Sequence, residues 1–497
     1  MDLLVLMLGL CLSWGLLQAL LYIANRGKSG NVGKLPPGPR PLPVIGNLLE
    51  LGSLPHRSLA KLASVYGPIM SLKLGCITTV VVSSAPMARE ILQTHDVSFS
   101  NRLTPDSLTP FRYHEHALPW VPVSPLWRNL RRICNVHLFA SSTLDSSQHI
   151  RRRKIQELLS HVGKCSETGS SVNIGEAGFT TTLNLLGNTI VSMDLADPTS
   201  ESAKEFKELV WQIMVEVGKP NLADYFPVLK RVDPQGARRR MTGYFRRLFD
   251  VFQGIIKSRL QAREVTGSVR KNDVLDTLLE LSMEEFQIKH LFFDLFVAGT
   301  DTTSSTLEWA MAELLRNPEK LSKAQAELEN VIGSGKPVEE TDIARLPYLQ
   351  ATVKEIFRMH PAIPLLLPRR AGATTQVGGY TIPEGSQILV NVWAICRDPA
   401  TWKDPDEFIP ERFLGLDIDV KGQNFELLPF GGGRRICPGM PLAIRMLHLM
   451  LGSLLNSFDW KLEDGVSPGT MKMGDKFGIT LQKAQSLRAV PLPRNSH

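Results

Sequence analysis

The stretch Phe430-Gly-Gly-Gly-Arg-Arg-Ile-Cys-Pro-Gly439 places one cysteine between glycines, directly before an apolar segment. Residues 440–455 are predicted to form a long helix, so the free N–H groups and the dipole at its start would lie beside the sulfur of Cys437. Positive potential and nearby donors favour the thiolate, which is the form of cysteine that binds metals. The stretch therefore predicts that Cys437 is a metal ligand.

The neighbours of Cys437 suit a flat, anionic cofactor. We expect Gly433 and Gly439 to allow positive φ and a close approach of the backbone, Arg435 to meet an anionic group, and Phe430 to keep water from the metal. The other cysteines have no paired spacing, which argues against a disulfide framework and for a reducing compartment. We expect them to be inert buried thiols: Cys11, Cys76, Cys134, Cys165 and Cys396.

The pattern of Phe430, Gly433, Arg435, Cys437 and Gly439 resembles the haem-binding loop of the cytochrome P450 family. The resemblance implies a mainly α-helical fold with small β-sheets, in which haem b lies between a long central helix and the cysteine loop. Cys437 would be the axial ligand of the haem iron. A thiolate in that position pushes electron density toward the iron and favours cleavage of the O–O bond.

Residues 3–23 carry no charge and are long enough to span a membrane as a helix. A cleaved signal peptide is the alternative, but no basic residue precedes the run and no small-residue cleavage site follows it. Basic residues follow the run, which predicts a cytoplasmic body. With the resemblance, this implies a single-pass protein of the endoplasmic reticulum membrane. We expect a membrane anchor (1–24), a basic and proline-rich hinge (25–40) and a haem-thiolate catalytic domain (41–497).

The formal charge of +7 is modest. This charge is explained equally well by a solvated basic surface and by a surface that contacts anionic lipid or an acidic protein. Arg128 and Arg132 resemble the basic patch on which the family docks its acidic reductase, although they are also explained as solvated charges. The chain contains no nucleic-acid-binding motif, internal repeat or low-complexity tract.

Trp127 and Arg131 lie four residues apart and would share a helix face, where an indole N–H and a guanidinium can reach one anion. Such pairs are common on surfaces. The resemblance implies that they bind the haem propionates, with Arg102 and Arg369 as further contributors.

Residues 290–315 predict an apolar helix that contains Ala298-Gly-Thr-Asp-Thr-Thr303. Glycine inside a helix costs about 1 kcal/mol relative to alanine. The hydroxyl of Thr302 can bond to a carbonyl one turn back and open the helix into a polar groove; a packing glycine is the alternative explanation. The stretch matches the family's oxygen-activation motif, which implies a role for Thr302 in oxygen activation and for Asp301 in the proton path.

Glu355 and Arg358 are three residues apart on a predicted helix, and Arg412 supplies a possible third member of the group. Exposed pairs of this kind contribute little to stability. The three residues resemble the family's Glu-Arg-Arg lock, which implies a buried position behind the haem.

The other expected elements frame a pocket. We predict a hairpin of residues 69–74 and 78–83, strands at 364–369 and 386–391, a hairpin tip at 476–480 and mostly helix over 144–281. Residues 221–227 interrupt two helices and form either a packed pair or a lid that dips into the membrane. A long loop over 104–123 would cover the substrate, and the spacing of its His114 and His116 argues against a metal site. The resemblance implies weak candidates for substrate contact: Phe111, His114, Leu118, Val121, Ala298, Leu365, Leu366, Leu367, Phe477 and Ile479.

The amino-acid sequences of residues 232–236, 294–310 and 449–456 are similar to those of the geraniol 8-hydroxylase and ferruginol synthase branch of the plant microsomal enzymes. This implies hydroxylation of a terpenoid with O2 and NADPH, with electrons from a separate NADPH-cytochrome P450 reductase because the chain has no flavin or nicotinamide domain. A monoterpene alcohol such as geraniol, at C8, is the first expectation and an abietane-type diterpene the alternative. Two further alternatives are a reductase-independent rearranging enzyme and a non-catalytic haem-binding membrane protein, a sensor or carrier. The intact Asp301 and Thr302 argue against the first, and a helix weakened at Gly299 and Thr302, which a mere binder does not need, argues against the second.

Overall fold

The computed structural model describes residues 33–196, 201–264 and 270–494, and before them only positions 9, 13 and 15. The predicted anchor (1–24) and residues 25–32 of the predicted hinge otherwise lie outside the described residues. Within the described ranges, no helix combines the length and the apolar character needed to cross a bilayer. The membrane anchor stays a prediction.

The described end of the hinge lies along the first strand of the main sheet. The carbonyl of Pro37 accepts a hydrogen bond from the Ser71 N–H (2.8 Å), and the carbonyl of Pro36 accepts one from the Ser71 hydroxyl (2.6 Å). A Cβ at Gly38 would lie 1.8 Å from the Ser71 carbonyl oxygen, so only glycine fits there. This part of the segment is therefore held on the catalytic body.

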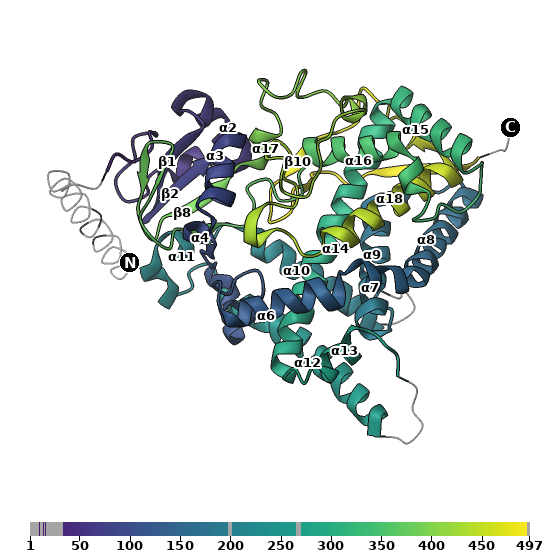
Figure 1. Cartoon of the computed structure of the whole chain (residues 1–497), viewed down its shortest axis with the longest axis horizontal. Coiled ribbons are helices and arrows are strands. Elements are labelled where there is room, and N and C mark those ends of the chain that lie inside the picture. Colours follow the sequence, from purple (N-terminus) through teal and green to yellow (C-terminus); the bar gives the residue numbers. More distant parts are fainter. Residues whose placement is uncertain are drawn as a thin grey trace.

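The fold is mainly helical and is built around α14 (Glu285–Arg316). This helix packs against α9 (Ile174–Val191), α10 (Glu201–Gly218), α12 (Ala237–Glu264), α16 (Pro347–Met359) and α18 (Met440–Ser457) (Figure 1). The prediction of helix over 144–281 is confirmed. The remaining α-helices are α2 (Pro55–Tyr66), α3 (Ala85–Arg89), α4 (Asp96–Phe99), α5 (Tyr113–His116), α6 (Pro125–Ile133), α7 (Ser141–Ser146), α8 (Gln148–Thr168), α11 (Leu222–Tyr225), α13 (Val274–Glu280), α15 (Pro318–Val331) and α17 (Val392–Ile395).

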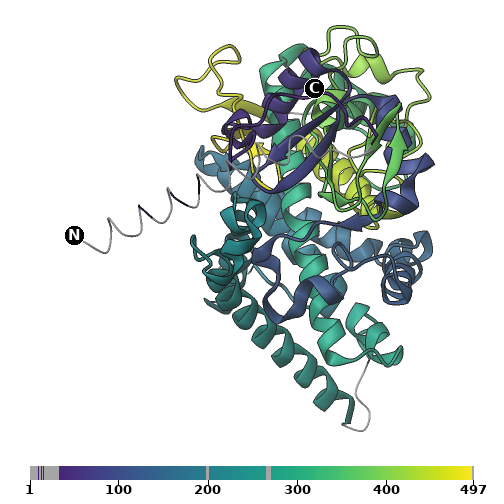
Figure 2. The same cartoon turned by 90° about the vertical axis from the view of Figure 1, so that its left-hand side faces the viewer.

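The sheets are small. The strands β1, β2 and β8 lie at one end of the molecule, at the left of Figure 1, while β9 and β12 pack on α18 and α8, and α12 projects away at the bottom (Figures 1 and 2). The largest sheet has the order β1-β2-β8-β5-β3. Its strands are β1 (Ile69–Leu74), β2 (Ile77–Val82), β3 (Asn101–Arg102), β5 (Arg369–Arg370) and β8 (Gln387–Val390). The others are β4 (Val172–Asn173) with β12 (Arg488–Pro493) and β9 (Phe458–Leu462), β6 (Thr375–Val377) with β7 (Tyr380–Ile382), and β10 (Asp475–Lys476) with β11 (Gln482–Lys483).

Most predicted strands are confirmed. β1 and β2 form the expected antiparallel hairpin, β8 covers most of 386–391, and residues 477–481 form the expected tip between β10 and β11. The predicted strand at 364–369 is wrong, because only Arg369 is paired. Pro364 and Pro368 have no N–H to donate, and Leu366 has a φ of 50°.

The predicted loop over 104–123 is largely irregular, but it contains short helical turns at Asp106–Leu108, Pro110–Arg112 and α5. The predicted interruption at 221–227 is confirmed, because α11 and a 3₁₀ turn at Pro227–Arg231 separate α10 from α12. Both segments carry positions with positive φ or proline, which end regular helices.

Candidate active site

The loop around Cys437 is closed by a hydrogen bond from the Cys437 N–H to the carbonyl of Phe430 (3.0 Å). Gly433 has a φ of 66°, and a Cβ there would lie 2.0 Å from the carbonyl oxygen of Leu92, so the predicted need for glycine is confirmed. Gly439 has a φ of −80°, so the expected positive φ is wrong at that position. Gly439 instead caps the start of α18, in a conformation open to other residues.

The sulfur of Cys437 has the donors that the sequence predicts. α18 begins at Met440, and the backbone N–H groups of Gly439 and Met440 lower the pKa of the Cys437 thiol. Burial raises the pKa of the Cys437 thiol, while these donors and Arg131 partly offset that rise. A bound metal cation stabilises a thiolate further. The site is therefore built for a cysteine that is ionised when a metal is bound.

The other described cysteines are free thiols. Burial raises the pKa of Cys134 to about 12 and that of Cys396 to about 11, so both are the inert thiols that were expected. The same expectation is wrong for Cys76, which is exposed because it lies in the turn between β1 and β2, and Cys165 is only half-buried. Cys11 lies outside the described residues.

Guanidinium groups gather beside the cysteine loop. Arg435 lies 5.1 Å from the ring centre of Trp127 and donates to the carbonyls of Ser100, Leu118 and Val121. Arg102 donates to the carbonyls of Pro119 and Leu367, and Arg131 to that of Ile436. Arg369 donates to Asp96 (3.3 Å) and to the carbonyls of Phe99 and Gly432. We call Arg102, Arg131, Arg369 and Arg435 the arginine cluster.

The arginine cluster carries more positive charge than its surroundings neutralise. Burial and repulsion from Arg369 lower the pKa of Arg102, and the same causes lower that of Arg435 to about 10. Among the described residues, Asp96 is the one carboxylate that pairs with this cluster, through Arg369. An anion bound here would gain charge-assisted hydrogen bonds and relieve the repulsion. The cluster therefore fits the predicted binding of carboxylate groups.

The surface of α14 opens at Ala298 and Thr302. From Thr300 to Leu315 every residue except Thr302 is buried, whereas Ala298 is exposed. The Thr302 hydroxyl donates to the Ala298 carbonyl (2.9 Å), as expected. The expected opening of the helix is wrong, because α14 is continuous and a side-chain bond to a carbonyl at i−4 does not displace its backbone bond. A Cβ at Gly299 would lie 2.9 Å from Leu186 Cδ1, so this glycine serves helix packing.

Asp301 is buried beside Thr302 and is bound from the C-terminal hairpin. The side-chain amide of Gln482, on β11, donates to Asp301 Oδ1 (2.7 Å). Burial raises the pKa of Asp301. A buried carboxyl near an open patch of helix is suited to hold or pass on a proton.

The predicted three-residue group forms at the C-terminal end of α16. Arg358 donates to both oxygens of Glu355 (2.7 and 2.8 Å), and Arg412 donates to Glu355 Oε1 (3.0 Å). The Glu355 and Arg358 side chains are completely buried. Arg358 also donates to three carbonyls, those of Cys396, Pro405 and Glu407. The group therefore ties α16 to the segment that leads to the cysteine loop.

The candidates for substrate contact fall into two groups. Leu118 and Val121 adjoin the arginine cluster through their carbonyls, Ala298 lies on the open patch of α14, and Leu366 borders Gly431 of the cysteine loop. The others lie in other surroundings: Leu365 belongs to an apolar cluster with β1, Phe477 stacks on His56, Ile479 borders Gly218, and Phe111 is exposed beside Phe249.

Asp294 is a site residue that the sequence reasoning missed. It is buried on α14, accepts hydrogen bonds from the Tyr113 hydroxyl and the Leu118 N–H (2.8 Å), and burial raises its pKa to about 7. It fixes the 104–123 loop to the central helix. The available signal was an aspartate inside the apolar run Leu291–Val297, four residues before Ala298.

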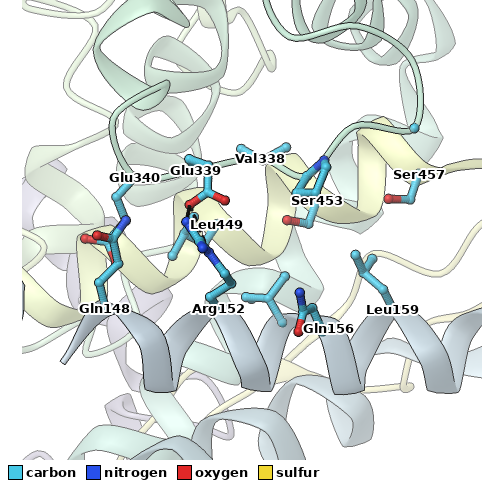
Figure 3. Close-up of a pocket in the computed structure, with 13 residues that line it drawn as sticks. Gln148, Arg152, Gln156, Leu159, Val338, Glu339, Glu340, Leu449, Ser453 and Ser457 are labelled. Atoms are coloured by element: carbon cyan, nitrogen blue, oxygen red, sulfur yellow. Dashed lines mark hydrogen bonds and ion pairs between the residues drawn. The ribbon is translucent and has the colours of Figure 1, made fainter.

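His116 and His114 take no part in a metal site in the described part of the chain. The His116 ring lies 5.5 Å from that of His290, but no group of metal-ligating residues forms there. A cavity of about 90 Å³ lies between α8 and α18, and none of the predicted site residues lines it (Figure 3). Arg152, Leu159, Glu339, Leu449 and Ser453 contribute to its walls.

Residues 36–487 match the family model for cytochrome P450. The chain belongs to the cytochrome P450 family. It is 55% identical to a geraniol 8-hydroxylase of Swertia mussotii, over 99% of each chain, and 51% identical to a drimenol monooxygenase of Persicaria hydropiper, over 99% of this chain and 97% of that one. A zebrafish cytochrome P450 solved with progesterone superimposes with a TM-score of 0.76 at 26% identity, covering 88% of this chain and 99% of that one.

The chain is therefore a cytochrome P450 monooxygenase, and its cofactor is haem b with the Cys437 thiolate as axial ligand. The site fits this cofactor on two independent observations. Cys437 has backbone donors at its sulfur, and the arginine cluster has an excess of positive charge beside the cysteine loop. Haem matches both features, because its iron can bind the Cys437 thiolate and its propionate carboxylates can bind the arginine cluster.

Proposed function

We propose that this P450 hydroxylates a monoterpene alcohol such as geraniol at C8, with O2 and with electrons that a separate NADPH-cytochrome P450 reductase supplies. The observation that carries the proposal is the similarity to a geraniol 8-hydroxylase over nearly the whole of both chains. Haem with a thiolate ligand supplies oxygen activation. The chain's own residues hold the cofactor, admit the substrate and handle the proton.

These roles are assigned to the residues that surround the open patch of α14. The arginine cluster and Trp127 bind the propionates, and Phe430 packs against Phe357 and excludes water from the proximal side. Ala298 and Thr302 face the substrate, with Leu118, Val121 and Leu366 at the border. Asp301 supplies a proton and the hydroxyl of Thr302 hands it on, since the two residues are consecutive on α14, with Asp301 buried and Thr302 on the open patch.

We further propose a single-pass anchor at residues 1–24 that holds the catalytic domain on the cytoplasmic side of the endoplasmic reticulum membrane. Exposed apolar side chains support a contact with lipid: Leu42, Val44, Leu49, Leu222, Val228 and Val232. They lie on segments that both contact the β1–β2 turn, since the Gly75 N–H donates to Ile45 O (3.1 Å) and the Cys76 N–H to Tyr225 O (2.9 Å). The basic Lys230 and Arg231 lie in the second segment.

Product analysis tests the proposal. Yeast microsomes that contain the chain and a plant reductase are given NADPH and geraniol, with Cys437→Ser as the blank. We expect an 8-hydroxylated product that needs NADPH and is absent from the blank. A hydroxylated abietane diterpene, and none from geraniol, would move the substrate to the larger terpenoids. Product formed without NADPH would contradict the reductase-dependent reaction, and no product from any terpenoid at normal haem content would overturn the substrate class.

Thr302→Ala tests proton delivery. We expect the variant to bind haem normally, to consume NADPH, and to form severalfold less product per NADPH, because the hydroxyl that passes on the proton is gone. The missing product is expected to appear as hydrogen peroxide. Both are measured in the microsomal assay beside Thr306→Ala, which removes the same kind of helix hydroxyl one turn further along, where it is bonded to the Thr302 carbonyl. Equal coupling of NADPH to product in wild type and Thr302→Ala would contradict the role.

A further inference from the structure

The second limb of the C-terminal hairpin follows one face of α14. The Ser305 hydroxyl and the Trp309 indole N–H both donate to the carbonyl of Leu481, at 3.1 Å, and Gln482 donates to Asp301. Asp301, Ser305 and Trp309 are spaced by four residues and so lie above one another on the helix. The hairpin is therefore fixed to three successive turns of α14. The contact at the first turn is made by the carboxyl of Asp301, the proposed proton donor.

The carboxyl of Asp301 depends on neutral partners. Among the described residues, no cation forms an ion pair with it, and both groups that lower its pKa, Thr480 and Gln482, are neutral. The carboxylate of Glu308 on α14 interacts with Asp301 by charge repulsion. Burial raises the pKa of Asp301, and the Thr480 hydroxyl and the Gln482 amide each offset part of that rise. The amide of Gln482 therefore both orients the carboxyl and favours its ionised form.

The hairpin is also held at its base, so Gln482 has a fixed position. Asp475, at the start of the first limb, accepts hydrogen bonds from His56 (3.0 Å) and Arg57 (3.0 Å) on α2. The Leu481 N–H donates to the carbonyl of Ala362 (2.8 Å), in the segment before β5. These bonds come from two different parts of the chain, and they leave the side chain of Gln482 directed at Asp301.

We propose that Gln482 is the positioning residue for Asp301, and that through it the C-terminal hairpin is part of the proton-delivery path. The inference rests on the proposed function. In the productive reaction, substrate R–H, O2, NADPH and H⁺ give R–OH, water and NADP⁺. When the proton is not delivered in time, O2, NADPH and H⁺ give hydrogen peroxide and NADP⁺. By holding the carboxyl of Asp301, Gln482 thus helps to determine which of these two reactions takes place.

The test replaces Gln482 by methionine, which has a similar length and no donor, with the shorter Gln482→Leu as a second variant. We expect severalfold more peroxide per NADPH, and a larger solvent isotope effect on product formation, because proton transfer becomes slower. Ser305→Ala is the matched control, since it removes a neighbouring hairpin bond and leaves Asp301 untouched. Haem content and melting temperature are compared first, so that variants that fold poorly are recognised.

A second measurement does not need the substrate. Infrared titration of the resting protein follows the carboxyl band of Asp301, which is identified by its loss in Asp301→Asn. Because the lost bond favoured the ionised form, we expect Asp301 to titrate at higher pH in Gln482→Leu and Gln482→Met, and at the wild-type pH in Ser305→Ala. Unchanged titration in both Gln482 variants, or an equal rise in peroxide in Ser305→Ala, would overturn the inference. Failure of the proposed function is recognised separately, by a wild type that makes no terpenoid product.

Discussion

Glu355→Ala is expected to give a chain that retains no haem. The substitution leaves the buried guanidinium of Arg358 without its carboxylate, and removing one partner of a buried pair costs about 3–5 kcal/mol. It also removes the acceptor for the Ile409 N–H and for Arg412, so the segment after α16 loses its tie to the helix. Because that segment leads to the cysteine loop, the loop would no longer be held against the cofactor. Haem content per chain and the melting temperature measure the effect.

Two variants define what the Glu355 result means. Glu355→Gln keeps the size and one acceptor oxygen, so we expect partial retention of haem between wild type and Glu355→Ala. Asp464→Ala breaks an exposed pair with Lys461 at the same three-residue spacing, and we expect no change. A Glu355→Ala protein with full haem and a wild-type melting temperature would show that the lock is dispensable.

Cys437→Ser is expected to abolish product formation completely. Serine does not ionise at neutral pH, so the donors from Gly439 and Met440 would meet a neutral hydroxyl and the iron would lose its thiolate. The absorption spectrum of the reduced carbon monoxide complex, which reports the axial ligand, would lose the form that a thiolate gives. Cys76→Ser, at an exposed turn, is the matched control and should retain both spectrum and product. Product at the wild-type rate from Cys437→Ser would refute the ligand assignment.

Features set by short spacings were predictable from the sequence. The cysteine loop with its following helix, the Trp127 and Arg131 helix face and the Glu355 and Arg358 pair all depend on residues within one or two turns. In each case the chain's local geometry decides which side chains lie together. The irregular segment before Arg369 was missed because two prolines outweighed its apolar pattern.

Contacts between distant residues could not be predicted in the same way. Tyr113 and Asp294 are separated by 181 positions, as are Gln482 and Asp301. The packing of the whole domain brings these pairs together, and no periodicity marks them. The negative φ of Gly439 could not be predicted for a similar reason. The start of α18 determines the backbone conformation of Gly439, whereas the sequence motif shows only that the residue is a glycine.

The bonds of Asp294 set a rule for exchanging loops between relatives. The Tyr113 hydroxyl and the Leu118 N–H both donate hydrogen bonds to this carboxyl, and the Leu118 carbonyl accepts one from Arg435. A transplanted 104–123 segment that lacks the tyrosine would leave the buried Asp294 without its hydroxyl donor. It would also disturb Arg435, which binds the Leu118 carbonyl. Selection for new substrates can therefore vary the half-buried side chains at 114–116, whereas the buried Ala117, Tyr113 and the Leu118 backbone must be inherited together with α14.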